Sequence, residues 1–124
     1  MRIRSFGSVK VYEPERHQID QAVALLARHL SSFPEVMTVR LIGSYHRGDF
    51  GPFSDVDIVV VVEESDQRFM DRCEKYRPSS FPVALDLFVY TESEVRMMQQ
   101  SAHPFWRHIE QNHTLLFQRK EPSF

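Results

Sequence analysis

Apolar residues follow two different spacings along the chain, which together predict an α/β protein. Between Pro14 and Pro34 they recur every three or four residues, as they do on one face of a helix. Segments 36–43, 55–62 and 83–90 have the apolar runs or the two-residue alternation of strands. The four consecutive valines that end the second strand predict burial on both of its faces. The predicted helical stripe consists of Ile19, Val23, Leu26, Ala27, Leu30 and Phe33.

Shorter patterns complete a small sheet with flanking helices. Segments 8–12 and 113–118 have the alternation of short strands. Thr91 and Glu94 have the spacing of a capping box, which opens a helix, and Pro104 is suited to the first turn of another. We therefore expect an α/β (α+β) fold, a small mixed sheet flanked by helices, in one domain that covers residues 1–124.

Segment 65–76 predicts one more helix after the valine strand. Ser65 has the side chain of an N-cap residue. Apolar residues follow at helical spacing, which predicts that they face inward. The expected inner side consists of Phe69, Met70, Cys73 and Tyr76.

Composition narrows the class of protein. The chain has 124 residues, 42% hydrophobic and 26% charged, which fits one globular domain. Fifteen basic and seventeen acidic residues give a net charge of −2, so no general positive field attracts nucleic acid. The apolar runs are shorter than the roughly 20 residues that cross a bilayer, and no apolar signal core opens the chain. We expect a soluble, cytoplasmic protein without a membrane partner, and the single Cys73 suits a reducing compartment.

Two aspartates at the start of the valine strand indicate a metal site. Asp55 and Asp57 are two residues apart, so their side chains leave one face of the strand with Cβ atoms roughly 6 to 7 Å apart. Asp86 lies on an otherwise apolar face of the next strand. Carboxylates that repel one another need a compensating cation, and an all-oxygen donor set suits Mg²⁺. Two ions about 3.5 to 4 Å apart could then serve a phosphate-transfer reaction.

The Gly-Ser pair that ends the preceding strand predicts a phosphate site. Gly43 permits close approach of the backbone to a phosphate, and a short helix that begins at Ser44 would direct free N–H groups toward an anion. The Ser44 hydroxyl and the Arg47 guanidinium could reach the same phosphates. Asp-x-Asp or Gly-Ser alone is more typical of a solvated turn. Their joint occurrence with Asp86 favours a functional site.

Other residues are weaker candidates for chemistry. The six histidines have no metal-ligand spacing, although His46 lies beside the predicted phosphate loop and could contact the nucleotide or the acceptor. The aromatic stripe at Phe105 and Trp106 is more typical of packing than of base stacking. Phenylalanines in loops could stack on a base, cover the site or bind a partner, and these are Phe50, Phe53 and Phe81.

The combination of motifs resembles the nucleotidyltransferase superfamily that includes DNA polymerase beta, and within it the minimal, stand-alone nucleotidyltransferases of bacteria and archaea. The resemblance implies a mixed sheet with two Mg²⁺ ions. It also implies transfer of a nucleoside monophosphate from a triphosphate, by default ATP, to an acceptor hydroxyl, with release of pyrophosphate. The residues that carry it are Gly43-Ser44, Asp55-Val56-Asp57 and Asp86, with Arg47, Gly48 and Ser54 where such proteins commonly have them.

The resemblance also implies roles for these residues. The three aspartates, Asp55, Asp57 and Asp86, would be catalytic and would bind the metals, and Asp86 would help to deprotonate the acceptor. The residues expected to hold the nucleotide are Gly43, Ser44, Arg47 and Ser54.

Three hypotheses about the acceptor and the function remain open. Minimal proteins of this family are often antitoxins that silence a HEPN-type toxin by adding AMP to one of its tyrosines, so the resemblance implies such a protein partner. A second reading changes the acceptor to a small hydroxylated compound such as an aminoglycoside, with a homo-oligomer completing the pocket. A third is a non-catalytic module that acts by occluding its partner. The three intact aspartates favour an enzyme.

Overall fold

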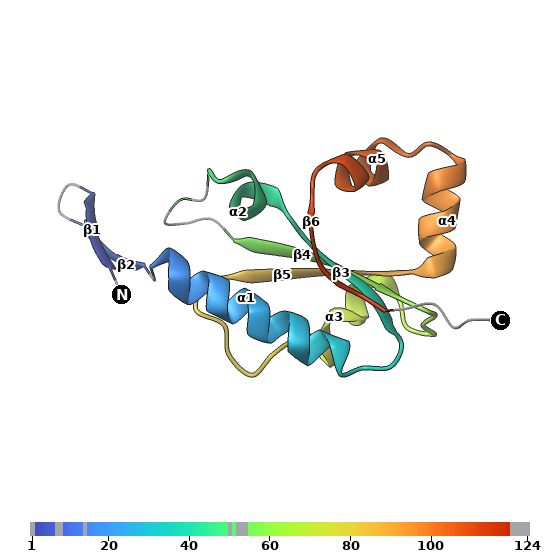
Figure 1. Ribbon diagram of the computed structural model, residues 1–124, viewed down its shortest axis with the longest axis horizontal. Helices are drawn as coiled ribbons and strands as arrows, with labels where there is room; N and C mark the ends of the chain where they lie inside the picture. Colours follow the sequence, from blue (N-terminus) through green and yellow to red (C-terminus); the bar gives the residue numbers. More distant parts are fainter. Residues whose placement is uncertain (1, 7–8, 14, 50, 52–54, 120–124) are drawn as a thin grey trace.

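A four-stranded mixed sheet forms the centre of the protein (Figure 1). The computed structural model describes residues 2–6, 9–13, 15–49, 51 and 55–119. β4 pairs with β5 in parallel and with β3 antiparallel, and β3 pairs antiparallel with β6. The predicted mixed sheet is confirmed. In spatial order its strands are β5 (Leu85–Thr91), β4 (Val56–Val62), β3 (Val36–Ile42) and β6 (Thr114–Gln118).

Helices cover both faces of the sheet, as the valine strand requires. The long helix α1 (Arg16–Ser31) packs on one face, where alternate residues of β4 meet its apolar stripe. On the other face lie α4 (Glu92–Gln100) and α5 (Pro104–Gln111) (Figure 1). There Val59 and Val61 contact Trp106 and Ile109. β4 is therefore buried on both sides, since one set of side chains faces α1 and the other faces α5.

The helix ends agree with the capping signals. The Thr91 hydroxyl accepts a hydrogen bond from the backbone N–H of Glu94 at 3.2 Å, and Glu94 Oε1 accepts one from the backbone N–H of Thr91 at 2.8 Å. This capping box opens α4, as expected. Glu15 is the N-cap of α1, and Pro14 lies outside the described residues.

The helix expected over 65–76 is wrong in extent and in the placement of Met70, whereas Tyr76 is buried and Cys73 packs against the core as expected. The segment forms a 3₁₀ turn, η1 (Phe69–Asp71), and a single helical turn, α3 (Cys73–Tyr76). Met70, expected inside, is 80% exposed, whereas Arg72 is buried. Arg72 can lie inward because its guanidinium is satisfied: Nη1 and Nη2 donate to the two carboxylate oxygens of Glu94 at 2.6 and 3.1 Å. Hydrophobic spacing could not reveal a buried ion pair formed with α4.

The strand expected over 8–12 belongs to a separate hairpin. β1 (Arg2–Phe6) and β2 (Val9–Glu13) pair antiparallel and form a two-stranded sheet beside the N-terminal end of α1 (Figure 1). The predicted short strand forms one half of this hairpin, and the residue pattern did not indicate its partner β1. In the described part of the chain, no helix is long and apolar enough to cross a membrane.

Candidate active site

The parallel pairing of β4 and β5 brings the three predicted carboxylates to one end of the sheet. Asp57 on β4 and Asp86 on β5 are direct register partners, and Asp55 immediately precedes β4. Residues two apart on a strand share a face, so the carboxylates share the face that carries Val59 and α5. The structure therefore places these side chains together at the start of two strands that begin 29 residues apart in the chain.

Mutual repulsion and burial perturb these carboxyl groups. The pKa of Asp57 is raised to about 6: burial is the largest cause, the charges of Asp86 and Asp55 add to it, and the charge of Arg47 opposes them. A side-chain hydrogen bond with Asp86 is the largest cause that raises the pKa of Asp55. Such shifts indicate a cluster of negative charge that nearby basic side chains compensate only in part.

Gly43 lets the Asp57 carboxylate lie against the backbone of the Gly-Ser turn. Its φ of +77° is left-handed, a conformation that favours glycine. A Cβ placed on Gly43 would lie 3.2 Å from Cγ of Asp57 and closer than 3.0 Å to Oδ2. Ile42 and Asp57 are register partners on β3 and β4, which sets up this approach. Gly43 of the Gly-Ser motif and Asp57 of the Asp-x-Asp motif therefore lie against each other.

The short helix α2 (Gly43–Arg47) is anchored from two sides. It begins at Gly43, one residue before the expected start. The buried Tyr45 donates hydrogen bonds through its hydroxyl to the Asp20 carboxylate and to the Arg16 carbonyl of α1. His46 Nδ1 lies 2.9 Å from Thr114 Oγ1 on β6. The Gly-Ser turn is thus held between α1 and the sheet edge.

Sequence reasoning missed both anchors of α2. The partners of Tyr45 and His46 lie 25 and 68 residues away in the chain. Tyr45 has no counterpart at helical or strand spacing, so no local signal could identify its role. Only folding brings α1 and β6 to either side of the turn.

The remaining predicted nucleotide-binding residues have different placements. The Ser44 carbonyl accepts hydrogen bonds from the N–H groups of Gly48 and Asp49 at 3.0 and 3.1 Å, which close the turn after α2. Arg47 is exposed, lies 3.4 Å from Asp49 Oδ2 and acts electrostatically on Asp57. Arg47 is therefore available to an anion at the carboxylate end. Ser54 lies outside the described residues, as do Phe50 and Phe53.

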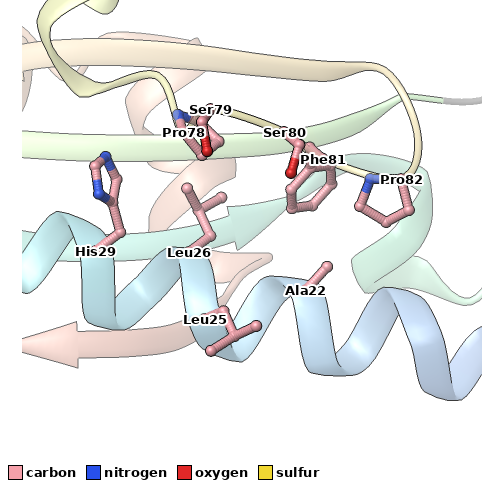
Figure 2. A pocket seen from close by; sticks show the side chains of 9 residues that line it. All are labelled: Ala22, Leu25, Leu26, His29, Pro78, Ser79, Ser80, Phe81 and Pro82. Carbon is pink, nitrogen blue, oxygen red and sulfur yellow. The ribbon is translucent and has the colours of Figure 1, made fainter.

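Phe81, the third loop phenylalanine considered for the site, lies elsewhere. It packs with the core on the α1 face, opposite the carboxylates. Figure 2 shows its ring beside α1, where the loop 78–82 and residues such as Leu26 and His29 line a cavity of about 450 Å³. Phe81 is therefore not placed to stack on a base at the Gly-Ser turn.

The donor chemistry of the carboxylate cluster fits Mg²⁺. Its donors are all carboxylate oxygens, which magnesium prefers, and their raised pKa values show that a cation would be stabilising. Among the described residues, no three His, Cys, Asp or Glu side chains already have the arrangement of a metal site.

Comparisons with known proteins identify the class and then the family. The fold is that of a nucleotidyltransferase: it is similar to a candidate nucleotidyltransferase from Sulfolobus solfataricus, with a TM-score of 0.57, 21% identity and coverage of 83% of each chain. The model of the nucleotidyltransferase domain family matches residues 23–120. The chain therefore belongs to this family.

A toxin-antitoxin structure with AMP-PNP is also similar, with a TM-score of 0.49, 18% identity and coverage of 82% of this chain and 74% of that one. No curated protein sequence matches the chain.

Proposed function

We propose that this nucleotidyltransferase moves AMP from ATP to an acceptor hydroxyl at the carboxylate end of the sheet. The observation that carries the proposal is the register pairing of Asp57 with Asp86, with Asp57 packed against Gly43. This pairing joins the predicted phosphate turn to the predicted metal ligands. Family membership independently supports nucleotidyl transfer.

Asp55, Asp57 and Asp86 are the residues that would hold two Mg²⁺ ions. When bound, the ions would neutralise phosphate charge and lower the pKa of the attacking hydroxyl. The perturbed carboxyl groups support this assignment, because a divalent cation relieves the repulsion that raises the pKa of Asp55 and Asp57.

The other residues of the site have separate tasks in this proposal. Gly43 and Ser44 bind the triphosphate at the turn, and the exposed Arg47 pairs with a phosphate oxygen. Asp86 is exposed, so it can reach an acceptor. A bond forms between the acceptor oxygen and the α-phosphorus as the bond to pyrophosphate breaks, and the Asp86 carboxylate accepts the hydroxyl proton.

For the acceptor, we propose a tyrosine of a HEPN-type toxin, which makes the chain an antitoxin and a protein adenylyltransferase. The resemblance of the Gly-Ser, Asp-x-Asp and later aspartate motifs to the minimal nucleotidyltransferases supports this choice. The intact carboxylates support catalysis over simple occlusion, since a protein without catalytic need would gain stability by losing them.

Calorimetry tests nucleotide binding first. We expect AMP-PNP with Mg²⁺ to bind the intact protein, and binding to disappear with EDTA or in the Asp55→Ala/Asp57→Ala variant. The matched control is Asp71→Asn, which removes an exposed carboxylate of η1 that pairs with Arg68. No heat from the folded intact protein, or equal heat from the double variant, would refute the site.

Transfer of label from α-³²P-ATP to the toxin tests the acceptor. We expect labelling by the intact protein, less than one hundredth of it with Asp86→Asn, and none when the target tyrosine is changed to phenylalanine. If Asp57→Asn still silences the toxin without labelling it, occlusion is the mechanism and the tyrosine proposal fails. Labelling of an aminoglycoside in place of the toxin would likewise reject it.

A further inference from the structure

A second polar cavity lies on the α4/α5 face, near the far end of β4 from the carboxylates. It has a volume of about 190 Å³ and lies between α4, α5 and the strands β3, β4 and β6. Val61 lines it, and Asp57 precedes Val61 by four residues, so the two sites are about 13 Å apart along the strand. Its lining includes the polar side chains of Thr38, Arg40, Gln99, Trp106 and Gln118.

Arg40 lines this cavity with a guanidinium that is only partly hydrogen-bonded. Its Nη1 donates to Thr38 Oγ1 at 2.6 Å, but its buried Nε has no hydrogen-bond partner among the described residues. In the described part of the chain, no carboxylate lies within ion-pair distance of Arg40, and Glu110 acts on it only through longer-range attraction. The Nε and Nη2 groups form the edge that binds both oxygens of a carboxylate in a bidentate pair.

Trp106 supplies a second unpaired donor in the same wall. It is 1% exposed, and its Nε1 has no hydrogen-bond partner in the part of the chain that the structure describes. The Arg40 Cζ lies 5.6 Å from the centroid of the Trp106 ring, so the cation rests over the indole. Buried donors without partners are rare because each costs free energy. Two of them beside one cavity indicate a missing acceptor.

We propose that this cavity binds a small carboxylate, with Arg40 as its bidentate partner and the Trp106 indole N–H as an additional donor. A water molecule occupies about 30 Å³ in the liquid, so the volume suits a ligand of a few heavy atoms. Gln99 and Gln118 are exposed and can turn to admit it.

The other charges in the lining leave Arg40 as the anion-binding group. The Glu92 carboxylate lies 3.7 Å from Arg96, which offsets its charge. Arg119 donates to the backbone carbonyls of Ser31, Phe33 and Val36, so its guanidinium is already engaged. A carboxylate entering the cavity would therefore pair with Arg40.

The only tryptophan of the chain, Trp106, reports directly on this cavity. We expect acetate and L-glutamate, titrated against sodium chloride at constant ionic strength, to produce a saturable change in tryptophan emission. Arg40→Gln should abolish the change, and Arg40→Lys, which keeps the charge but loses the bidentate edge, should weaken binding about tenfold or more. Arg68→Gln is the control, because Arg68 is 89% exposed and lies outside the cavity lining, and it should respond like the intact protein.

Several outcomes would overturn the carboxylate site. One is a linear change in emission without saturation. Another is a response in folded Arg40→Gln and Arg40→Lys that equals the response of the intact protein. A third is tighter binding of inorganic phosphate than of either carboxylate. Circular dichroism establishes that each variant is folded. Asp57→Asn should keep the response, and its loss there would assign the signal to the metal site.

Discussion

Replacing Gly43 by alanine tests whether the Gly-Ser turn and the Asp57 carboxylate form one site. The added methyl group meets two obstacles. The left-handed φ of +77° costs a residue with a Cβ roughly 1 to 2 kcal/mol, offset by up to about 1 kcal/mol from the less flexible unfolded chain. The Cβ also overlaps the Asp57 carboxylate, and overpacking typically costs about 1 to 3 kcal/mol.

Gly48→Ala is a matched control for the first obstacle alone. Gly48 has a φ of +87°, and a Cβ there would meet nothing within 4 Å. We expect Gly48→Ala to lower the free energy of unfolding by roughly 1 kcal/mol, and Gly43→Ala to lower it by roughly 2 to 3 kcal/mol. Asp57 is half-buried and can turn aside, which places the overlap cost toward the lower end of its range.

Urea denaturation and calorimetry measure the two consequences. Displacement of the Asp57 carboxylate should weaken Mg²⁺-dependent AMP-PNP binding at least tenfold in Gly43→Ala. In an Asp57→Ala background, the excess destabilisation of Gly43→Ala over Gly48→Ala should disappear, because the overlapping group is gone. If the two glycine variants have the same stability and the same affinity in the intact background, the proposed contact is wrong.

Three other predictions concern pH and anchoring. The raised pKa of Asp57, about 6 against an ordinary 3.8, means that the folded state holds a proton that the unfolded state releases. The Asp57 contribution to the free energy of unfolding therefore falls as pH rises from about 4 to 6. Asp57→Asn should remove this fall and raise the free energy of unfolding by roughly 1 kcal/mol at pH 7. Urea denaturation of both proteins measures this, and free energies of unfolding that change in parallel across pH 4 to 7 would contradict the prediction. Arg72→Ala should lower the free energy of urea unfolding by roughly 1.5 to 3 kcal/mol, because it removes two hydrogen bonds to the charged, partly exposed Glu94; a cost below about 0.5 kcal/mol would contradict a stabilising pair. Tyr45→Phe frees α2 from Asp20, so calorimetry should show AMP-PNP binding weakened about threefold to tenfold, and unchanged affinity would show that this anchor does not position the turn.

Local patterns predicted most of the elements, and their errors have a common cause. The stripe of α1, the valines of β4 and the capping box at Thr91 each rest on neighbours in the chain, and each is confirmed. The prediction for segment 65–76 was wrong because it did not include Arg72, a charged residue that is buried and pairs with Glu94 on α4. A buried ion pair depends on a distant partner, which hydrophobic spacing does not reveal.

The residue types and their spacing determined by themselves that two carboxylates leave one strand face and that a glycine-serine turn precedes them, because strand and turn geometry are local. Only the tertiary structure decided that Asp86 lies beside Asp57, since their pairing depends on β4 and β5 running parallel. It also decided that Gly43 leaves room for an Asp57 oxygen, and that Arg40 and Trp106 meet beside one cavity. These contacts join residues that are distant in the chain, and the packing of the whole core sets their positions.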